Sequence, residues 1–249
     1  MNNPGHYCSR GLFLPTIFNH HPMEVSWLKR VLSYFFLVTI KEIPSKFNPG
    51  LCLQMEAGRL LLNSKNANYS YGNLQKAFEE VFETIEIEKR SLDKVLILGL
   101  GTGSVIDILQ RQYGFDPEIT GVEIDEAVIA CLKYWDQLDL SKTTVLNQDA
   151  ETAMDQLSDT FDLIIVDLFI DMEVHPIVFT EKFSQQLKSL LTPQGFVLLN
   201  FIANTKAQRE KFAELQLMLM RFFKDIKGHD VMGMNKILEL KTESIVVNI

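Results

Sequence analysis

Cysteine is scarce in this chain of 249 residues. The three cysteines, Cys8, Cys52 and Cys131, lie far apart and form no C-x-x-C pair or other metal-ligand pattern. This spacing argues against a disulfide framework and against a zinc site, so we expect no metal. Free thiols suit a reducing compartment, and we expect a cytoplasmic protein.

Clusters of basic residues are missing as well. The formal net charge is −8, and the basic pairs Lys29-Arg30 and Lys89-Arg90 are isolated from each other. A nucleic-acid surface needs grouped Lys and Arg side chains that neutralise phosphates. We therefore expect no nucleic-acid partner and interpret both pairs as solvated helix faces.

The sequence also lacks an apolar run of the roughly 20 residues that a membrane-spanning helix needs. The apolar stretch Val31–Ile40 is about half that length, and Lys41 and Glu42 close it. Basic residues precede the stretch, as in a signal segment, but no small-residue cleavage site follows it. We predict a buried amphipathic helix at this place and no membrane partner.

Composition is otherwise ordinary, with 47% apolar and 22% charged residues, so a packed core is expected. Residues 1–22 show no periodicity, and we predict a disordered extension there, with Met23 as an alternative start. Residues 23–75 are predicted to form a small N-terminal region, and residues 76–249 the main domain.

The N-terminal region combines a helical and a strand-like pattern. We predict a helix from Glu24 to Val38. Alternating runs at 51–55 and 59–63, separated by Glu56-Ala57-Gly58, predict a β-hairpin. A further helix from Asn73 to Ile87 leads into the main domain.

The main domain alternates strands and helices, which predicts an α/β fold with a parallel sheet covered on both faces. Two more strands follow in the tail, around Gly233-Met234. Together they give a Rossmann-like sheet of seven strands with an antiparallel last strand. The expected strands are 94–99, 118–123, 143–147, 161–167 and 195–201, and the expected helices are 104–112, 126–135, 151–157, 177–191 and 205–222.

A glycine turn follows the first strand of the main domain, with glycine at positions 99, 101 and 103. Glycine lets the backbone approach a ligand without a Cβ clash. Glu123 ends the next strand, 20 residues after Gly103, where a carboxylate can accept hydrogen bonds from a ribose diol. The alternative is a plain left-handed turn between a strand and a helix.

The spacing of the turn favours one nucleotide over another. A dinucleotide fingerprint would need glycine at position 104, which is serine here. The pattern therefore favours S-adenosylmethionine, or a relative of it, over NAD.

Other carboxylates follow the later strands, where ligands of open α/β sheets bind. Asp149 could accept from an adenine amine or cap the next helix. Asp167 ends an apolar strand, so it must be paired or face a cavity, and we favour a functional role. Asp171, Glu173 and His175 lie in a following loop that could be simply solvated.

The order of these motifs resembles the spermidine synthase-like branch of the class I S-adenosylmethionine-dependent methyltransferase superfamily. The resemblance rests on the glycine turn, Val122-Glu-Ile-Asp125, Asn147-Gln-Asp149, Asp167 with a nearby second Asp, and 191–197, and it covers roughly residues 50–245. It implies a cofactor site, a catalytic pair (Asp167 and Asp171) and acceptor-binding residues (Tyr71 and Asp171). The implied cofactor-binding residues are Gly99, Gly101, Thr102, Gly103, Glu123, Asp149 and Asp167.

The sequence departs from the aminopropyltransferases of this branch in three places. They carry an acid in the glycine turn where this chain has Thr102, and that acid suits the cationic tail of decarboxylated S-adenosylmethionine. Their acidic residues before Ser-Tyr are replaced in Asn68-Tyr-Ser-Tyr71. Asp167 and Asp171 are four residues apart, where the synthases have three.

From these departures we predict an S-adenosylmethionine-dependent methyltransferase that acts on a small-molecule acceptor, with Asp167 orienting or deprotonating it. One alternative is an aminopropyltransferase of polyamine synthesis, which uses decarboxylated S-adenosylmethionine and holds the amine with Asp167 and Asp171. The other is a non-catalytic binding module. We expect a homodimer as the candidate assembly.

Overall fold

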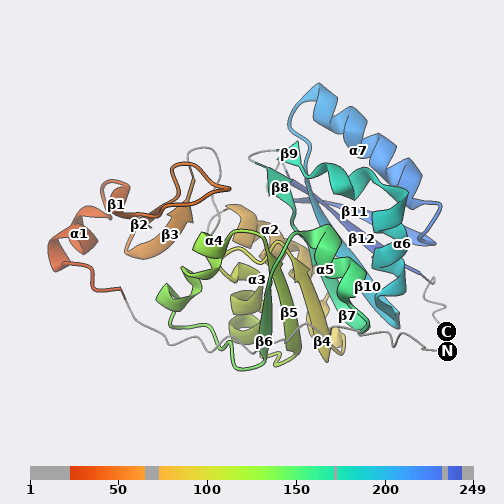
Figure 1. The fold of residues 1–249 in the computed structure, drawn as a ribbon, viewed down its shortest axis with the longest axis horizontal. Coiled ribbons are helices and arrows are strands. Elements are labelled where there is room, and N and C mark those ends of the chain that lie inside the picture. The colour runs from red at the N-terminus through yellow and green to blue at the C-terminus, as the bar shows by residue number, and fades with distance from the viewer. Residues whose placement is uncertain (1–22, 65–72, 171–172, 232–234, 243–249) are drawn as a thin grey trace, which may run out of the picture.

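The computed structural model describes residues 23–64, 73–170, 173–231 and 235–242. Within these ranges the chain forms a large central sheet and, at one end of the molecule, a small N-terminal sheet (Figure 1). The central sheet has the order β11-β12-β10-β7-β4-β5-β6, and β12 runs antiparallel to both of its neighbours. The predicted α/β fold, with seven strands and an antiparallel last strand, is confirmed. The strands are β4 (Lys94–Leu98), β5 (Glu118–Glu123), β6 (Thr143–Asn147), β7 (Phe161–Val166), β10 (Leu191–Ile202), β11 (Asp225–Val231) and β12 (Asn235–Lys241).

The central strands are apolar along their whole length because helices cover both faces of the sheet. Successive side chains of a strand point to opposite faces. Ile97 of β4 accordingly belongs to one buried cluster, and Leu96 and Leu98 belong to the other. The helices are α2 (Asn73–Thr84), α3 (Ser104–Asp107), α4 (Glu126–Ile129), α5 (Ala150–Gln156), α6 (Glu181–Ser189) and α7 (Lys206–Leu219).

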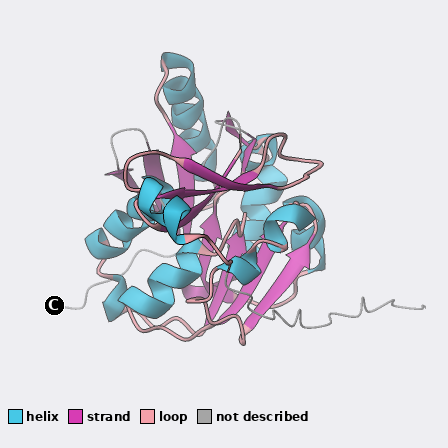
Figure 2. Cartoon of the chain, turned by 90° about the vertical axis from the view of Figure 1, so that its left-hand side faces the viewer, coloured by secondary structure: helices cyan, strands magenta, loops and turns pink. Residues whose placement is uncertain are grey.

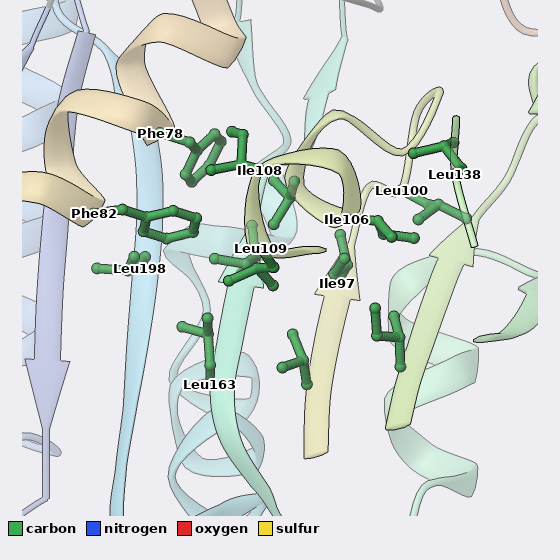
Figure 3. Packing of buried hydrophobic residues seen from close by; sticks show 14 of the residues in the cluster. Phe78, Phe82, Ile97, Leu100, Ile106, Ile108, Leu109, Leu138, Leu163 and Leu198 are labelled. Carbon is green, nitrogen blue, oxygen red and sulfur yellow. The ribbon is translucent and has the colours of Figure 1, made fainter. Parts of the chain in front are cut away.

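Each face of the sheet has its own set of helices. Helices α2, α3 and α4 contribute to the cluster that contains Ile97, and α5, α6 and α7 contribute to the other. Figure 3 shows the first cluster, in which Phe78 and Phe82 of α2 and Ile106 of α3 pack above the strands. This packing fixes the start of α3 directly after the glycine turn.

Several predicted helices are shorter or broken in the structure. The helix expected at 104–112 is α3 followed by a π-helical turn, η2 (Ile108–Gln112). The helix expected at 126–135 is α4 followed by η3 (Leu132–Tyr134). The helix expected at 177–191 is η4 (Pro176–Phe179) followed by α6.

The N-terminal sheet contains the predicted hairpin and one strand that was not predicted. Its strands are β1 (Val38–Glu42), β2 (Cys52–Glu56) and β3 (Arg59–Asn63), in that order. Ala57 and Gly58 connect β2 to β3 with positive φ angles of 48° and 78°. Two positive φ angles make the type I′ turn that suits a two-residue hairpin loop.

The prediction of a helix from Glu24 to Val38, with a buried apolar stretch, is wrong. Helix α1 (Trp27–Leu32) has six residues, none of them buried, and Val38 starts β1 by pairing with Met55 of β2. The apolar residues between α1 and β1 are exposed. An apolar run indicates that a segment would gain from burial. Whether another element packs over the segment depends on the tertiary structure.

Two further short strands, β8 (Phe169–Ile170) and β9 (Glu173–Val174), pair after β7. Helices long and apolar enough to cross a bilayer are absent from the described ranges. The predicted disordered extension, residues 1–22, lies outside those ranges. The domain boundaries, the homodimer and the cytoplasmic location remain predictions.

Candidate functional site

The glycine turn runs against the end of β7. Gly99 has a φ of +88°, and a Cβ atom there would lie 2.2 Å from the carbonyl oxygen of Asp167. The amide of Asp167 donates to the carbonyl of Leu98 at 2.9 Å, so β4 and β7 end side by side. Gly101 and Gly103 also have positive φ angles, of 56° and 80°. Glycine is therefore required at position 99 both by conformation and by space.

Glu123 lies at the end of β5 and is almost buried, with 7% of its surface exposed. Its Oε2 accepts from the amide of Gly101 at 3.0 Å, and its Oε1 accepts from the amide of Asp125 at 3.0 Å. Burial raises the pKa of Glu123, although these two donors oppose the shift. The predicted ribose anchor thus also holds the glycine turn in shape.

Two residues without an assigned role in the sequence analysis hold this strand end. Asn147, at the end of β6, donates to the carbonyls of Glu123 and Ile124, both at 3.0 Å. Asp125 caps α4 and accepts through Oδ2 from Ser45 at 2.6 Å. Asp125 could have been noticed in the sequence because it is an acid two residues after Glu123. Its partner Ser45 could not, because it lies 80 residues away in the chain.

Asp167 follows β7 and is half-buried. Its Oδ1 accepts from Nδ2 of Asn200 at 2.9 Å, and Oδ1 of Asn200 accepts from Asn235 at 3.0 Å. Burial and the negative charge of Glu123 raise the pKa of Asp167 to about 6, against the effect of the Asn200 hydrogen bond. Asn200 was missed, although it is an isolated polar residue within the apolar strand β10.

Two other predicted cofactor residues have structural roles. Asp149 is exposed and caps α5, because its carboxylate accepts from the amide of Thr152 at 2.9 Å and from its hydroxyl at 2.6 Å. These hydrogen bonds lower the pKa of Asp149. A contact between Asp149 and adenine remains a prediction. Thr102 is fully buried between the second and third glycines.

The two residues predicted to bind the acceptor lie outside the described ranges. Tyr71 and Asp171 both do so, and their roles remain predictions. Glu173 bonds to Gln208 at 3.1 Å and pairs with Lys211 at 3.3 Å on the surface. His175 accepts from the amide of Ile177 at 3.3 Å and starts η4. Glu173 and His175 thus both have hydrogen-bond partners within the protein.

The chemistry of the strand ends is that of an anionic site. Glu123 and Asp167 are close enough for the charge of one to raise the pKa of the other. Carboxylates accept hydrogen bonds from hydroxyls and attract cations. Among the described residues, no group of three or more His, Cys, Asp or Glu side chains could hold a metal ion.

A separate cleft of about 920 Å³ lies between the N-terminal sheet and the main domain. Arg30, Arg59, Glu79, Asp107 and Arg111 are among its lining residues. The carboxylates at the strand ends are not part of this lining. Its charges are mixed and partly satisfied, as in the 3.1 Å pair of Asp107 with Arg111. We therefore assign the candidate site to the strand ends.

Comparisons with known proteins identify the family of the chain. Residues 78–231 match the sequence model of the family described as "Spermine/spermidine synthase domain". Two curated relatives are named polyamine aminopropyltransferase. That of Sulfolobus acidocaldarius is 26% identical over 158 residues, covering 60% of this chain and 52% of the relative. That of Shigella boydii is 30% identical over 139 residues, covering 53% and 47%.

The chain thus spans about half the length of the curated relatives that it matches. Among solved structures, spermidine synthase from Thermotoga maritima has a TM-score of 0.63 at 15% identity, covering 83% of this chain and 75% of that one. A likeness at this identity supports the fold alone.

These comparisons contradict the methyltransferase predicted from the sequence. The matching family is described as a spermine/spermidine synthase domain, and both relatives are named polyamine aminopropyltransferase, which was the alternative. The prediction rested on Thr102 meeting the tail of the cofactor in place of an acid, and on two further departures, at 68–71 and at Asp171, which lie outside the described residues. Because Thr102 is fully buried, its identity does not report which tail the site accepts.

Proposed function

Because the chain belongs to the spermine/spermidine synthase domain family, we propose that it is an aminopropyltransferase. Its donor is decarboxylated S-adenosylmethionine, and its acceptor is a small aliphatic amine. The observation that carries the proposal is the carboxylate of Asp167, held by Asn200 at the edge of the glycine turn.

The charge of the site supports this donor and acceptor. The propylamine tail and the sulfonium of the donor are cationic, and an aliphatic amine is protonated in water. Glu123 and Asp167 supply negative charge at the ends of β5 and β7. Intact S-adenosylmethionine would add a carboxylate, which these two acids repel.

The residues present fit the nucleoside part of the donor. A carboxylate has about four lone-pair sites, and the Glu123 carboxylate accepts from the amides of Gly101, Asp125 and Ile124. The remaining lone-pair site can accept a hydrogen bond from a ribose hydroxyl. The glycine turn leaves the backbone uncovered beside it.

Asp167 is suited to accept a proton from the acceptor. With a pKa of about 6 it is mostly ionised at neutral pH, yet it is more basic than an ordinary aspartate. The donor supplies an electrophilic carbon next to its sulfonium. One proton of the acceptor's ammonium group passes to Asp167, the neutral nitrogen then forms a bond to that carbon, and the carbon–sulfur bond breaks with its electron pair on sulfur.

The test is an assay of the purified chain with decarboxylated S-adenosylmethionine and a panel of diamines and triamines. We expect release of the thioether nucleoside together with an aminopropylated amine, both followed by chromatography and mass spectrometry. Asp167→Asn should lower turnover by about 10²–10⁴-fold with donor affinity nearly unchanged. Asp155→Asn, on the exposed side of α5, is the control and should retain full activity.

Two outcomes would overturn the proposal. If calorimetry shows donor binding and no amine is modified, the chain is a binding module of the same fold. If Asp167→Asn turns over normally, the chemistry does not use the end of β7.

A further inference from the structure

A continuous segment near the N-terminus exposes an unusual amount of apolar surface. Among the described residues, nine of the thirteen exposed large apolar side chains come from 27–47. Trp27, Phe35 and Phe36 are 75%, 74% and 69% exposed. We call residues 27–47 the aromatic face; its exposed apolar members are Trp27, Leu28, Val31, Leu32, Tyr34, Phe35, Phe36, Leu37 and Phe47.

The aromatic face is built into the fold. Ser33, which is buried, accepts through its carbonyl from the amide of Ala57 at 2.7 Å and through its hydroxyl from the amide of Gly58 at 3.0 Å. The ring of Tyr34 lies against Gly58 so closely that a Cβ atom there would meet its hydroxyl at 2.7 Å. The turn of the β2–β3 hairpin thus fixes the end of α1 and the residues that follow it.

The position of α1 leaves the aromatic face free to meet a large surface. Figure 1 places α1 at the outer end of the molecule, beyond the N-terminal sheet, and Figure 2 shows it facing outward in front of that sheet. Contiguous exposed apolar surface on a folded protein marks an interaction site. A projecting end suits a broad, flat partner.

The charge of the segment identifies the chemistry of that partner. Within 27–47 there are four basic residues, Lys29, Arg30, Lys41 and Lys46, and one acidic residue, Glu42. The segment therefore carries a net charge of +3 within a chain of net charge −8. Two copies joined through this face would bring like charges together, so a partner with negative charge and apolar depth is favoured.

We propose that the aromatic face binds the surface of a bilayer that contains anionic lipids. Trp, Tyr and Phe side chains favour the boundary between headgroups and acyl chains, while Lys and Arg side chains attract anionic headgroups. The segment lies on the membrane and does not span it. Ser45, toward the other end of the segment from α1, bonds to Asp125 of the main domain. Acids of the main domain that lie more than about 8–10 Å from the membrane surface are screened by salt. The inference revises the expectation of no membrane partner and does not depend on the proposed function.

Vesicle flotation with the full chain tests the proposal, using phosphatidylcholine vesicles with and without phosphatidylserine. We expect binding to the phosphatidylserine vesicles and at least about tenfold weaker binding to phosphatidylcholine alone. Of the two tryptophans, Trp135 is buried, so a blue shift of the fluorescence on binding reports insertion of Trp27.

Variants separate the two contributions. Phe35→Ser with Phe36→Ser should abolish the blue shift, and Lys29→Glu with Arg30→Glu should weaken binding to anionic vesicles by about tenfold or more. Leu217→Ser with Met220→Ser is the matched control, because these side chains are 67% and 61% exposed on α7 and just after it, and it should bind like the parent.

Thermal unfolding of each variant should match that of the parent, since all six side chains are exposed. Absence of binding to both vesicle types would overturn the proposal. So would equal binding by the aromatic variant, or self-association through this face in sedimentation without any vesicle binding.

Discussion

Nδ2 of Asn200 donates to Oδ1 of Asp167 at 2.9 Å, joining the C-terminal part of β10 to the end of β7. The parallel pairing of Leu199 with Val166 brings these two residues side by side. Asn200 is itself held by Asn235 from the other side. A buried amide thereby stabilises the charged form of the carboxylate on which the proposed chemistry depends.

Replacement of Asn200 tests this relationship. Asn200→Leu removes the donor, so the pKa of Asp167 should rise further above about 6, by about one to two pH units. If the ionised form is active, the acidic limb of the pH–rate profile should move to higher pH by that amount. Asn204→Ala, at an exposed position, is the control. If the acidic limb of the profile does not move, Asn200 has a packing role and does not tune the pKa of Asp167.

Asp167 should also make stability depend on pH. Its pKa is raised from 3.8 to about 6 on folding, so its stabilising contribution is complete below pH 3.8 and is lost as the pH rises through about 6. Asp167→Asn should therefore be more stable than the parent at pH 8, by up to about 3 kcal/mol. The difference should disappear near pH 4 in urea unfolding. Equal stability of both proteins at all pH values would contradict the shift.

Gly99 offers a test of the contact between the turn and β7. Gly99→Ala would place a Cβ atom 2.2 Å from a backbone oxygen of Asp167, so the turn must move. Gly114→Ala is the control, because Gly114 has a similar φ of +71° with nothing within 4 Å of the added atom. The control should cost about 1 kcal/mol from backbone strain alone. We expect Gly99→Ala to lower the free energy of unfolding by at least about 2 kcal/mol more, and equal losses would argue against a close contact.

Glu123 should matter with and without a ligand. Glu123→Ala removes the acceptor for the amides of Gly101 and Asp125, and the free protein should lose about 1–3 kcal/mol of stability. Donor affinity should fall by about ten- to a hundredfold, since the ribose loses a charged acceptor. Glu123→Gln should have the smaller effect on stability. Thermal unfolding and calorimetry measure the two quantities; a loss of stability with unchanged affinity would leave Glu123 a purely structural role.

An ion cluster around the buried Glu239 of β12 supports stability. The Glu239 carboxylate lies 2.7 Å from Arg90, 2.9 Å from Lys241 and 3.2 Å from His229. Burial alone would raise the pKa of Glu239, but the hydrogen bonds from His229, Lys241 and Arg90 hold it far below 4.5. Its contribution is therefore present above pH 4.5 and is lost as the pH falls.

Glu239→Gln leaves the half-buried cations Arg90 and Lys241 without their counter-charge. We expect a loss of about 3–5 kcal/mol in urea unfolding at pH 7, and a smaller difference from the parent in acid. Glu118→Gln, which breaks an exposed pair with Lys94, should cost no more than about 1 kcal/mol. Similar losses in the two variants would contradict the importance of burial.

The sequence alone determined the main sheet and the position of its ligand edge. The side chains of an apolar run such as Val95–Leu98 are all buried only in a sheet that is covered on both faces. The glycines at 99, 101 and 103 then fix where the chain turns. Glu123 and Asp167 follow from the same periodicity, because each ends an apolar strand. These features depend on residues that are close together in the sequence, so they can be predicted from it.

Tertiary structure decided which side chain meets which. The pairing of Asn200 with Asp167 depends on the register of strands 33 residues apart, and the burial of Thr102 depends on what packs over the turn. The exposure of Phe35 and Phe36 depends on the lack of a covering element among the described residues, which an apolar run does not reveal. Local pattern sets conformational preference, but contact and burial are set by how distant segments come together.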